Sequence, residues 1–254
     1  MAADRDELIA FLDAELGAAG VRDWAPNGLQ VHGAAREVAR VATAVSATRA
    51  TIEGAQGFGA QLLVVHHGLF WHGATPVVDE ALRRRLEPLF AGGISLAAYH
   101  LPLDAHPMHG NNAGLARALG LAVEGVFAEA KGSHAGLWGT LPRSLDASEL
   151  GAAVAAACGR EPLVLGTRAG AVTRVGLASG GAARSLPEAA ALGLHALVTG
   201  EPEVDSAALA AELGVLCVAA GHHATERFGV RALGALLEER WGLETRFIDE
   251  ANPV

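Results

Sequence analysis

Residues 40–65, RVATAVSATRATIEGAQGFGAQLLVV, contain the alternation that decides the fold. A strand pattern is followed by a turn of small residues, a helical pattern, a glycine and a second, almost wholly apolar strand pattern. Strands that alternate with helices of about 10–15 residues predict an α/β fold with parallel or mixed sheets. The second strand leads directly into His66 and His67, so a buried strand is expected to end in two imidazoles.

The rest of the chain shows the same alternation, and each expected element is placed by its apolar periodicity. Helices are expected at 5–19, 47–57, 78–91, 111–119, 146–158, 184–192, 203–213 and 223–239. Strands are expected at 28–33, 39–46, 61–66, 94–99, 136–142, 162–166, 173–179, 195–199, 214–218 and 244–248.

The stretch 40–65 also repeats within the chain. Residues 174–199, RVGLASGGAARSLPEAAALGLHALVT, lie over it without a gap and show the same order of strand, turn, helix, glycine and strand. The following unit recurs too, since ISLAAYHLPLD (94–104) matches LCVAAGHHATE (216–226). Self-similarity of this kind is the signature of a repeated architecture. An internal duplication therefore predicts two similar α/β lobes that face each other and offer their strand-end loops to a shared cleft.

The lobes are assigned from the limits of this repeat. The first lobe is expected to span residues 1–128 and to be joined by the C-terminal segment 227–254, and the second to span residues 129–226. A chain of 254 residues is long enough for both lobes to bury a core.

The composition is that of a globular cytoplasmic protein, with 51% hydrophobic and 19% charged residues. A net charge of −9 disfavours nucleic acid and membrane surfaces as partners, because both repel an acidic protein. No apolar run approaches the roughly 20 residues of a membrane span, and the acidic N-terminus lacks the pattern of a secretory signal. The two cysteines are expected to be reduced core residues.

Metal-type side chains follow three of the expected strands. They are His66 with His67, His100 with Asp104, and His222 and His223 with Glu226. Functional groups gather at the carboxyl ends of strands in open α/β sheets. Imidazole and carboxylate together suit Zn, Mn, Fe or Ni, and the lack of thiolate argues against a structural zinc knuckle. The sequence therefore predicts a metal site in the cleft between the lobes.

The spacing constrains how these groups meet. His222 and Glu226 are four residues apart at the start of a helix, so both can point to one ion, whereas His223 is turned away by about 100°. His66 and His67 would face opposite sides of a regular strand, so they share a cluster only if the strand turns or two ions are present. A carboxylate such as Glu226 can bridge two ions that lie roughly 3.5–4 Å apart.

Each group taken alone has a structural interpretation. A histidine at a strand end is commonly hydrogen-bonded to the backbone, an H-x-x-x-E pair on a helix is commonly a surface pair, and the aspartate of LPLDAHP suits a turn or a helix cap. Asn27, Asn111 and Asn112 fix loops near the cleft or simply form turns, and the roles of His72 and Glu201 stay open. Three such groups at equivalent strand ends of a repeated unit favour the metal site.

Four motifs then carry a family resemblance over nearly the whole chain. They are NGLQV (27–31), HHGLFW (66–71), YHLPLDAHP (99–107) with GNN (110–112), and AAGHHATER (219–227). In this order they resemble the dinuclear-metal-centre, toroidal-hexamer proteins, Nif-three-like proteins often labelled "GTP cyclohydrolase 1 type 2 homologue". The chain is similar to their short bacterial form.

The resemblance implies a ligand set and an assembly. The implied ligands of two divalent ions (Zn, Fe, Mn or Ni) are His66, His67, Asp104, His222 and Glu226. Many members have tyrosine where this chain has His223, so that residue receives no ligand role. The resemblance also implies two intertwined α/β domains and a ring-shaped homohexamer whose metal sites face an inner cavity.

Three hypotheses of function remain after these observations. The first is a metal-dependent hydrolase that acts on a small-molecule substrate through a metal-bound hydroxide, with GTP cyclohydrolase chemistry suggested by the family label alone. In this reading His100 is an orienting residue or a general acid/base, although a hydrogen-bonded strand-end histidine fits it equally well. The second is a metal-handling or scaffold ring without turnover. The third is an interaction hub whose metal is structural. The open coordination expected from five ligands and two ions favours catalysis over such a structural metal, whose site four protein ligands usually close.

Overall fold

The computed structural model describes residues 1–254, and its internal contacts divide the chain into two units. Unit 1 consists of Met1–Leu103 and Gly229–Ala251, and unit 2 of Asp104–Phe228 and Asn252–Val254. The chain passes between the units within the helix α4 (Leu101–Ala105) and near the start of the helix α10 (Arg227–Trp241). None of the helices combines the length and the apolar character that a transmembrane span requires.

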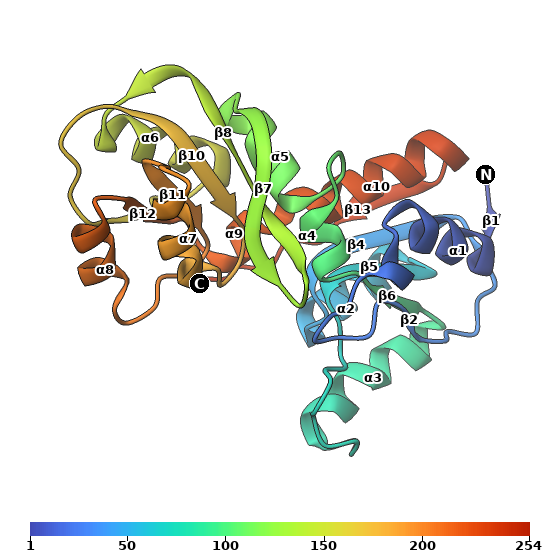
Figure 1. Cartoon of the computed structure of the whole chain (residues 1–254). Helices are drawn as coiled ribbons and strands as arrows, with labels where there is room; N and C mark the ends of the chain where they lie inside the picture. The colour runs from blue at the N-terminus through green and yellow to red at the C-terminus, as the bar shows by residue number, and fades with distance from the viewer. The chain divides into compact units, whose positions relative to one another are not determined.

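Unit 1 is built on a five-stranded sheet with the order β13-β4-β5-β6-β2, in which only β2 runs antiparallel to its neighbour. Its strands are β2 (Gly28–Val31), β4 (Arg40–Ser46), β5 (Leu62–His67), β6 (Ser95–Ala98) and β13 (Glu244–Phe247), with a small pair β1 (Ala3–Asp4) and β3 (Glu37–Val38) beside them. Its helices are α1 (Arg5–Glu15), the short η1 (Ala18–Gly20), α2 (Arg49–Phe58), α3 (Glu80–Gly92) and most of α10 (Figure 1).

Helices cover both faces of this sheet, which explains the apolar run before His66. Leu62 and Val64 of β5 pack in the core formed with α1 and α10, whereas Leu63 and Val65 pack in the core formed with α2 and α3. A central parallel strand that is buried on both faces has no polar alternation. The neighbouring helix α2 begins at a capping box formed by Thr48 and Thr51, so the sequence fixes its start locally.

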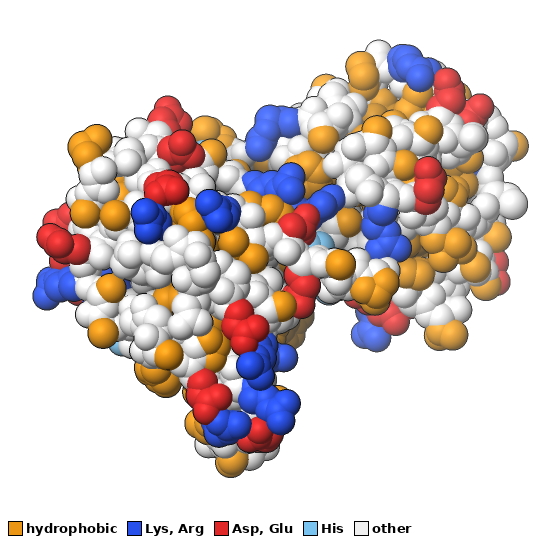
Figure 2. Space-filling view, turned by 180° about the vertical axis from the view of Figure 1, so that it is seen from behind, with side chains coloured by type: hydrophobic (Ala, Val, Ile, Leu, Met, Phe, Trp, Pro, Cys, Tyr) orange, Lys and Arg blue, Asp and Glu red, His pale blue; other side chains and the backbone are white.

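The helix α3 has few core contacts, and its charges lie on an exposed surface. Arg83 and Arg84 form ion pairs with Glu80, and Arg83 also pairs with Glu87. Basic and acidic side chains lie close together over the projecting segment at the bottom of Figure 2. Arg83 and Arg84 therefore lie on a solvated helix face that carries its own counter-charges.

Unit 2 is built on a six-stranded sheet with the order β7-β8-β10-β11-β12-β9. Its strands are β7 (Ala122–Ala130), β8 (Ser133–Leu145), β9 (Leu163–Leu165), β10 (Val172–Ala178), β11 (Ala196–Thr199) and β12 (Leu216–Ala219). Its helices are α5 (Asn111–Leu119), α6 (Ala147–Cys158), η2 (Ala183–Ser185), α7 (Leu186–Ala191), α8 (Ser206–Leu213) and α9 (His222–Thr225). β10, β11 and β12 are parallel, and β8 and β9 join them antiparallel.

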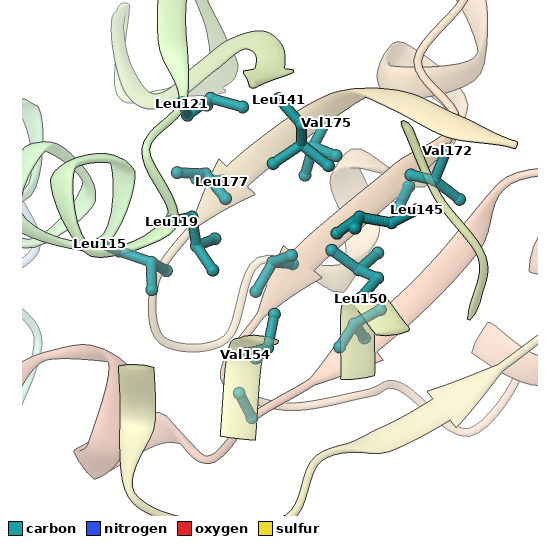
Figure 3. Close-up of a cluster of buried hydrophobic side chains, with 14 of the residues drawn as sticks. Leu115, Leu119, Leu121, Leu141, Leu145, Leu150, Val154, Val172, Val175 and Leu177 are labelled. Carbon is teal, nitrogen blue, oxygen red and sulfur yellow. The ribbon is translucent and has the colours of Figure 1, made fainter. Parts of the chain in front are cut away.

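The apolar core of unit 2 lies between the sheet and the helices α5 and α6. Figure 3 shows leucine side chains of these helices directed at valine and leucine side chains of the strands, all of them less than a tenth exposed. The labelled residues are Leu115, Leu119, Leu121, Leu141, Leu145, Leu150, Val154, Val172, Val175 and Leu177. On the opposite face, α7 and α8 cover a second cluster around Phe127.

The hairpin of β7 and β8 differs from the sequence-based expectation, which placed only one strand here, at 136–142. The two strands are joined by Lys131 and Gly132, both with positive φ, as a two-residue hairpin turn of the primed type requires. Because α5 and β7 pack with the rest of unit 2, the boundary lies after Leu103 and not after residue 128 as expected.

The expected helix 223–239 is interrupted. A single turn, α9, ends at Thr225 with Glu226 as its C-cap, and α10 then starts at Arg227. Glu226 has φ −105° and ψ 6°, so the helix breaks at the carboxylate that the sequence places in the metal site.

The two units share their central arrangement. In each, three parallel strands in sequence order carry an antiparallel strand at one side, β2 next to β6 and β9 next to β12. The mixed α/β class is thereby established. That this likeness arose by internal duplication stays a prediction.

Candidate metal centre

Three histidines form a cluster at the strand ends of unit 1. One ligand nitrogen from each of His66, His67 and His100 lies within 4.8 Å of the others. The rings of His66 and His67 are 4.6 Å apart, although both residues belong to β5. The ladder between β5 and β6 ends at the pair Val65–Ala98, so both histidines lie beyond it. This cluster lies wholly within unit 1.

Hydrogen bonds fix the orientation of the first two imidazoles. The Nδ1 atom of buried His66 lies 2.9 Å from the carbonyl oxygen of Tyr99 and must donate to it, because a carbonyl only accepts. The Nδ1 atom of His67 lies 3.0 Å from the hydroxyl of Ser46. In both residues Nδ1 is engaged by protein, and Nε2 is the atom that can bind a metal.

His100 is held by a buried carboxylate, that of Asp23. The Nδ1 atom of His100 lies 2.7 Å from Asp23 Oδ1, and the Asp23 side chain is 2% exposed. Asp23 also accepts from the side chain of Asn27 and from the backbone N–H groups of Trp24 and Leu101. Burial by itself would raise the pKa of Asp23, but the hydrogen bond and charge of His100 and these donors lower it to about 2. An ionised Asp23 therefore fixes the proton of His100 on Nδ1.

In unit 2 the cluster consists of Asp104, His222 and Glu226. His222 Nε2 lies 3.1 Å from Glu226 Oε1, and the ligand oxygens of Asp104 and Glu226 lie within 4.8 Å of each other. Both carboxylates are buried, at 7% and 2% exposure. Two carboxylates this close and this buried are not both ionised unless a cation lies beside them; otherwise a proton takes its place.

His222 lies between two carboxylates. Its Nδ1 atom is 2.6 Å from Glu201 Oε1, and its Nε2 atom faces Glu226. Burial lowers the pKa of His222, but Glu226 and Glu201 together raise it to about 9. Below that pH a proton occupies the space between Nε2 and Glu226, so a metal ion that binds there must displace the proton.

Asp104 is positioned by three neighbours of unit 2. Asn111 Nδ2 donates to Oδ1 over 2.9 Å and the Ser179 hydroxyl over 3.1 Å. Asn112 Nδ2 reaches the backbone oxygen of Asp104 at 3.4 Å and that of Ala135 at 2.7 Å. From the sequence, Asn111 and Asn112 could either fix a loop near the cleft or form a turn. In the structure both are hydrogen-bond partners of Asp104.

The donors within each unit suit a divalent transition metal. In unit 1 the imidazoles of His66, His67 and His100 have Nδ1 held by the protein, and in unit 2 the imidazole of His222, also held at Nδ1, lies with two buried carboxylates. Ligand imidazoles in metalloproteins are oriented in this way by a partner on the other nitrogen. Groups able to bind a metal ion are therefore present, and they involve the residues singled out from the sequence.

Other histidines lie apart from these clusters. His72 is exposed, and His106 stacks on His109 with ring centroids 5.1 Å apart. The sequence offered no signal for Asp23 or Ser46 as partners of histidine, because neither belongs to a spaced motif. Glu201 was left without a role, and the structure places it on His222.

A cavity of about 400 Å³ adjoins Glu201 in unit 2. Its walls include Arg160, Glu201 and Gly221 and the C-terminal residues Pro253 and Val254. It opens at the carboxyl ends of β11 and β12, where ligands bind in open α/β sheets.

Comparison with known proteins gives close relatives over the full length. The chain is 41% identical over 254 residues to a Pseudomonas aeruginosa protein named "GTP cyclohydrolase 1 type 2 homolog", covering 100% of both chains. It is 42% identical over 249 residues to the Escherichia coli K12 protein of the same name, covering 98% of each.

Two solved structures are similar in fold and in sequence. A structural-genomics protein, ybgI, described as of unknown function, superposes with a TM-score of 0.93 at 41% identity, covering 99% of this chain and 100% of that one. The protein TTHA1606 from Thermus thermophilus gives 0.88 at 39% identity with the same coverage. The family model described as Duf34/NIF3 (NGG1p interacting factor 3) matches residues 3–253. On this full-length match, the chain belongs to the Duf34/NIF3 family.

Proposed function

We propose that this protein is a hydrolase that depends on two divalent metal ions. His66 and His67 of unit 1 and Asp104, His222 and Glu226 of unit 2 are the proposed ligands. The observation that carries the proposal is the fixed orientation of the imidazoles, whose Nδ1 atoms are held while Nε2 is presented. A carboxylate buried to 2% exposure next to His222 supplies the negative charge that a cation requires.

The chemistry is divided between the metal and His100. When bound, a pair of divalent ions lowers the pKa of coordinated water and polarises the bond to be cleaved. His100 presents Nε2 as a proton acceptor, since Asp23 holds the proton on Nδ1. It therefore accepts a proton from the attacking water and returns it to the leaving group, as a general acid/base does. Asp23 acts through His100 and is a positioning residue.

The donor types support catalysis over a purely structural metal. Structural zinc sites are closed by four ligands, which are commonly thiolates. The proposed ligands are imidazoles and carboxylates, and neither of the two buried cysteines is among them. The printed name of the relatives makes GTP the first substrate to assay. We also propose that the protein is cytoplasmic, because its two cysteines are free and thiols stay reduced in that compartment.

We also propose a homohexamer. Val77 and Val78 and the α3 residue Phe90 are each 61% exposed, an apolar surface that suits burial against another copy. Light scattering on the purified chain is expected to give six copies per particle, and a monomer would contradict the assembly.

The test of the proposed hydrolase is metal content together with turnover. Protein loaded with Zn, Mn, Fe or Ni is expected to hold two ions per chain by elemental analysis. It is then assayed against GTP, other nucleotides, phosphoesters and cyclic amides. Two ions with no turnover of any class would overturn catalysis in favour of metal handling, and no bound ion would overturn the whole proposal.

Asp23→Asn tests the role given to His100. An asparagine has only one oxygen for the four donors that face Asp23, and where its amide N–H faces Nδ1 the proton of His100 moves to Nε2 and the acceptor is lost. Turnover is expected to fall about 10²–10⁴-fold, the range of one general acid/base, while metal content stays unchanged. ¹⁵N chemical shifts of the imidazole report the tautomer directly.

The same substitution has a consequence for stability at low pH. Because the pKa of Asp23 is lowered from 3.8 to about 2, its carboxylate stabilises the fold above pH 4, and this contribution is lost as the pH falls towards 2. Asp23→Asn should remove that pH dependence. The exposed Asp6→Asn serves as control, and an unchanged tautomer in Asp23→Asn contradicts the assignment.

A further inference from the structure

Large aromatic side chains lie in two loops beside the histidine cluster of unit 1 without entering the core. Trp24 is 43% exposed, Phe70 38% and Trp71 39%, and none of them belongs to an apolar core cluster. The chain has only 12 aromatic residues of the Phe, Trp and Tyr types, so three exposed ones in two adjoining loops are a notable concentration. Exposed aromatic surface of this kind marks a site for a ligand or partner.

Both indoles are placed around His100. The ring of Trp71 lies edge-on to that of His100 with centroids 5.3 Å apart, and Trp24 does so at 6.1 Å. Trp71 is also 6.0 Å from the ring of His67. A flat group bound against Trp71 would therefore lie beside the imidazoles of His67 and His100.

The loop that carries Trp71 is held in place. The backbone N–H of His72 donates to the carbonyl of Trp24 over 2.7 Å, which ties the two tryptophan loops together. Gly68 lies against Gln30, where a Cβ would come within 2.2 Å of the amide oxygen, and Leu69 N–H donates to that oxygen. Leu69 packs against the core, whereas the next two residues, Phe70 and Trp71, lie outside it.

We propose that Trp71, with Trp24, is a stacking subsite for the planar heteroaromatic ring of the substrate. This inference rests on the proposed hydrolase and names the class of compound that it acts on. The geometry favours a flat ring over a sugar, since sugar recognition needs free amides or carboxylates beside the indole. The polar side chains of the adjoining loop are engaged within unit 1: Asn27 with Asp23 and the His100 N–H, and Gln30 with Pro26 and Leu69.

Ligand-observed NMR on the full-length, metal-loaded protein tests the subsite. Guanosine, cytidine and nicotinamide serve as heteroaromatic probes, and ribose and glycerol phosphate as non-aromatic ones. At least one heteroaromatic probe is expected to bind saturably, and the non-aromatic ones are not. Trp71→Ala is expected to weaken binding about 5- to 150-fold, the range of one base–aromatic stack, and Trp71→Phe to restore most of it.

Val126→Ala is the control, because Val126 is exposed on β7 and lies outside both histidine clusters and outside the surface proposed for the homohexamer. Binding that is unchanged in Trp71→Ala, equal binding of ribose, or the absence of binding by all three rings would overturn the subsite. A change in particle mass of Trp71→Ala without ring binding would overturn it in favour of contact with a second copy. Metal content is measured on the same samples, so a chain that binds rings but no metal refutes the hydrolase and not the stacking.

Discussion

Glu226→Gln is expected to abolish turnover and to remove at least one of two bound ions. A neutral amide cannot bridge two cations, and its N–H group would point at one of them. Loss of an outer hydrogen-bond partner alone costs about 10–100-fold in metal affinity, so loss of a ligand should cost more. The substitution keeps the volume of a side chain that is 2% exposed, so the fold should persist. Elemental analysis and calorimetric titration measure the effect.

The pH dependence of metal binding gives a second readout of the same variant. In the metal-free protein the pKa of His222 is raised from 6.5 to about 9, so metal binding releases a proton below pH 9 and its affinity rises with pH up to that value. Glu226→Gln removes one of the two carboxylates that raise this pKa, so proton release should end at a lower pH. Titrations in buffers of different ionisation enthalpy count the protons.

The control for Glu226→Gln is Glu244→Gln. Glu244 is an exposed residue in a surface pair with Arg40, and such pairs contribute about 0–1 kcal/mol. It should bind metal as the native protein does. Two ions held with native affinity by Glu226→Gln would exclude Glu226 as a ligand.

The sequence predicted most of the sheet strands because their residues are buried on both faces. The runs before His66 and before Gly200 read as strands without any alternation, and both lie in the middle of a sheet. The strand β7 was missed because its residues are largely exposed and its turn, Lys131–Gly132, is not one of the strong hairpin dipeptides. Such a strand is stabilised by its pairing with β8, and the residue pattern of the strand itself does not reveal that pairing.

The candidate ligands were predictable for a related reason, since a side chain directly after a buried strand has its position fixed by that strand. Their partners were not. Asp23 is 77 residues from His100, and Glu201 is 21 residues from His222 in a separate loop. Hydrogen bonds between loops depend on the tertiary structure, and no spacing in the sequence encodes them.

Gly200→Ala is expected to destabilise the protein and to weaken metal binding together. A Cβ at residue 200 would lie 2.6 Å from His222 Cα and 2.7 Å from the carbonyl oxygen of Gly180, and both contacts are backbone. Gly200 is hydrogen-bonded on both sides, from its N–H to Gly180 and from the Gly221 N–H to its carbonyl, so it cannot move away. Overpacking of this kind costs about 1–3 kcal/mol.

The displaced atom is the backbone of a proposed ligand, so the two effects are coupled. In a chain of this size the cost corresponds to a fall in Tm of roughly 2–12 °C. The same displacement should change the distance between His222 Nε2 and Glu226 Oε1 and so weaken metal binding. Gly57→Ala is the matched control: it lies within α2 with no atom near its Cβ, and the substitution should stabilise by about 0.4–1 kcal/mol. Equal stability and equal metal affinity of Gly200→Ala and the native chain would contradict the close approach of these strand ends. If Gly200→Ala lost stability but kept native metal affinity, the contact between Gly200 and His222 would not position His222 as a metal ligand.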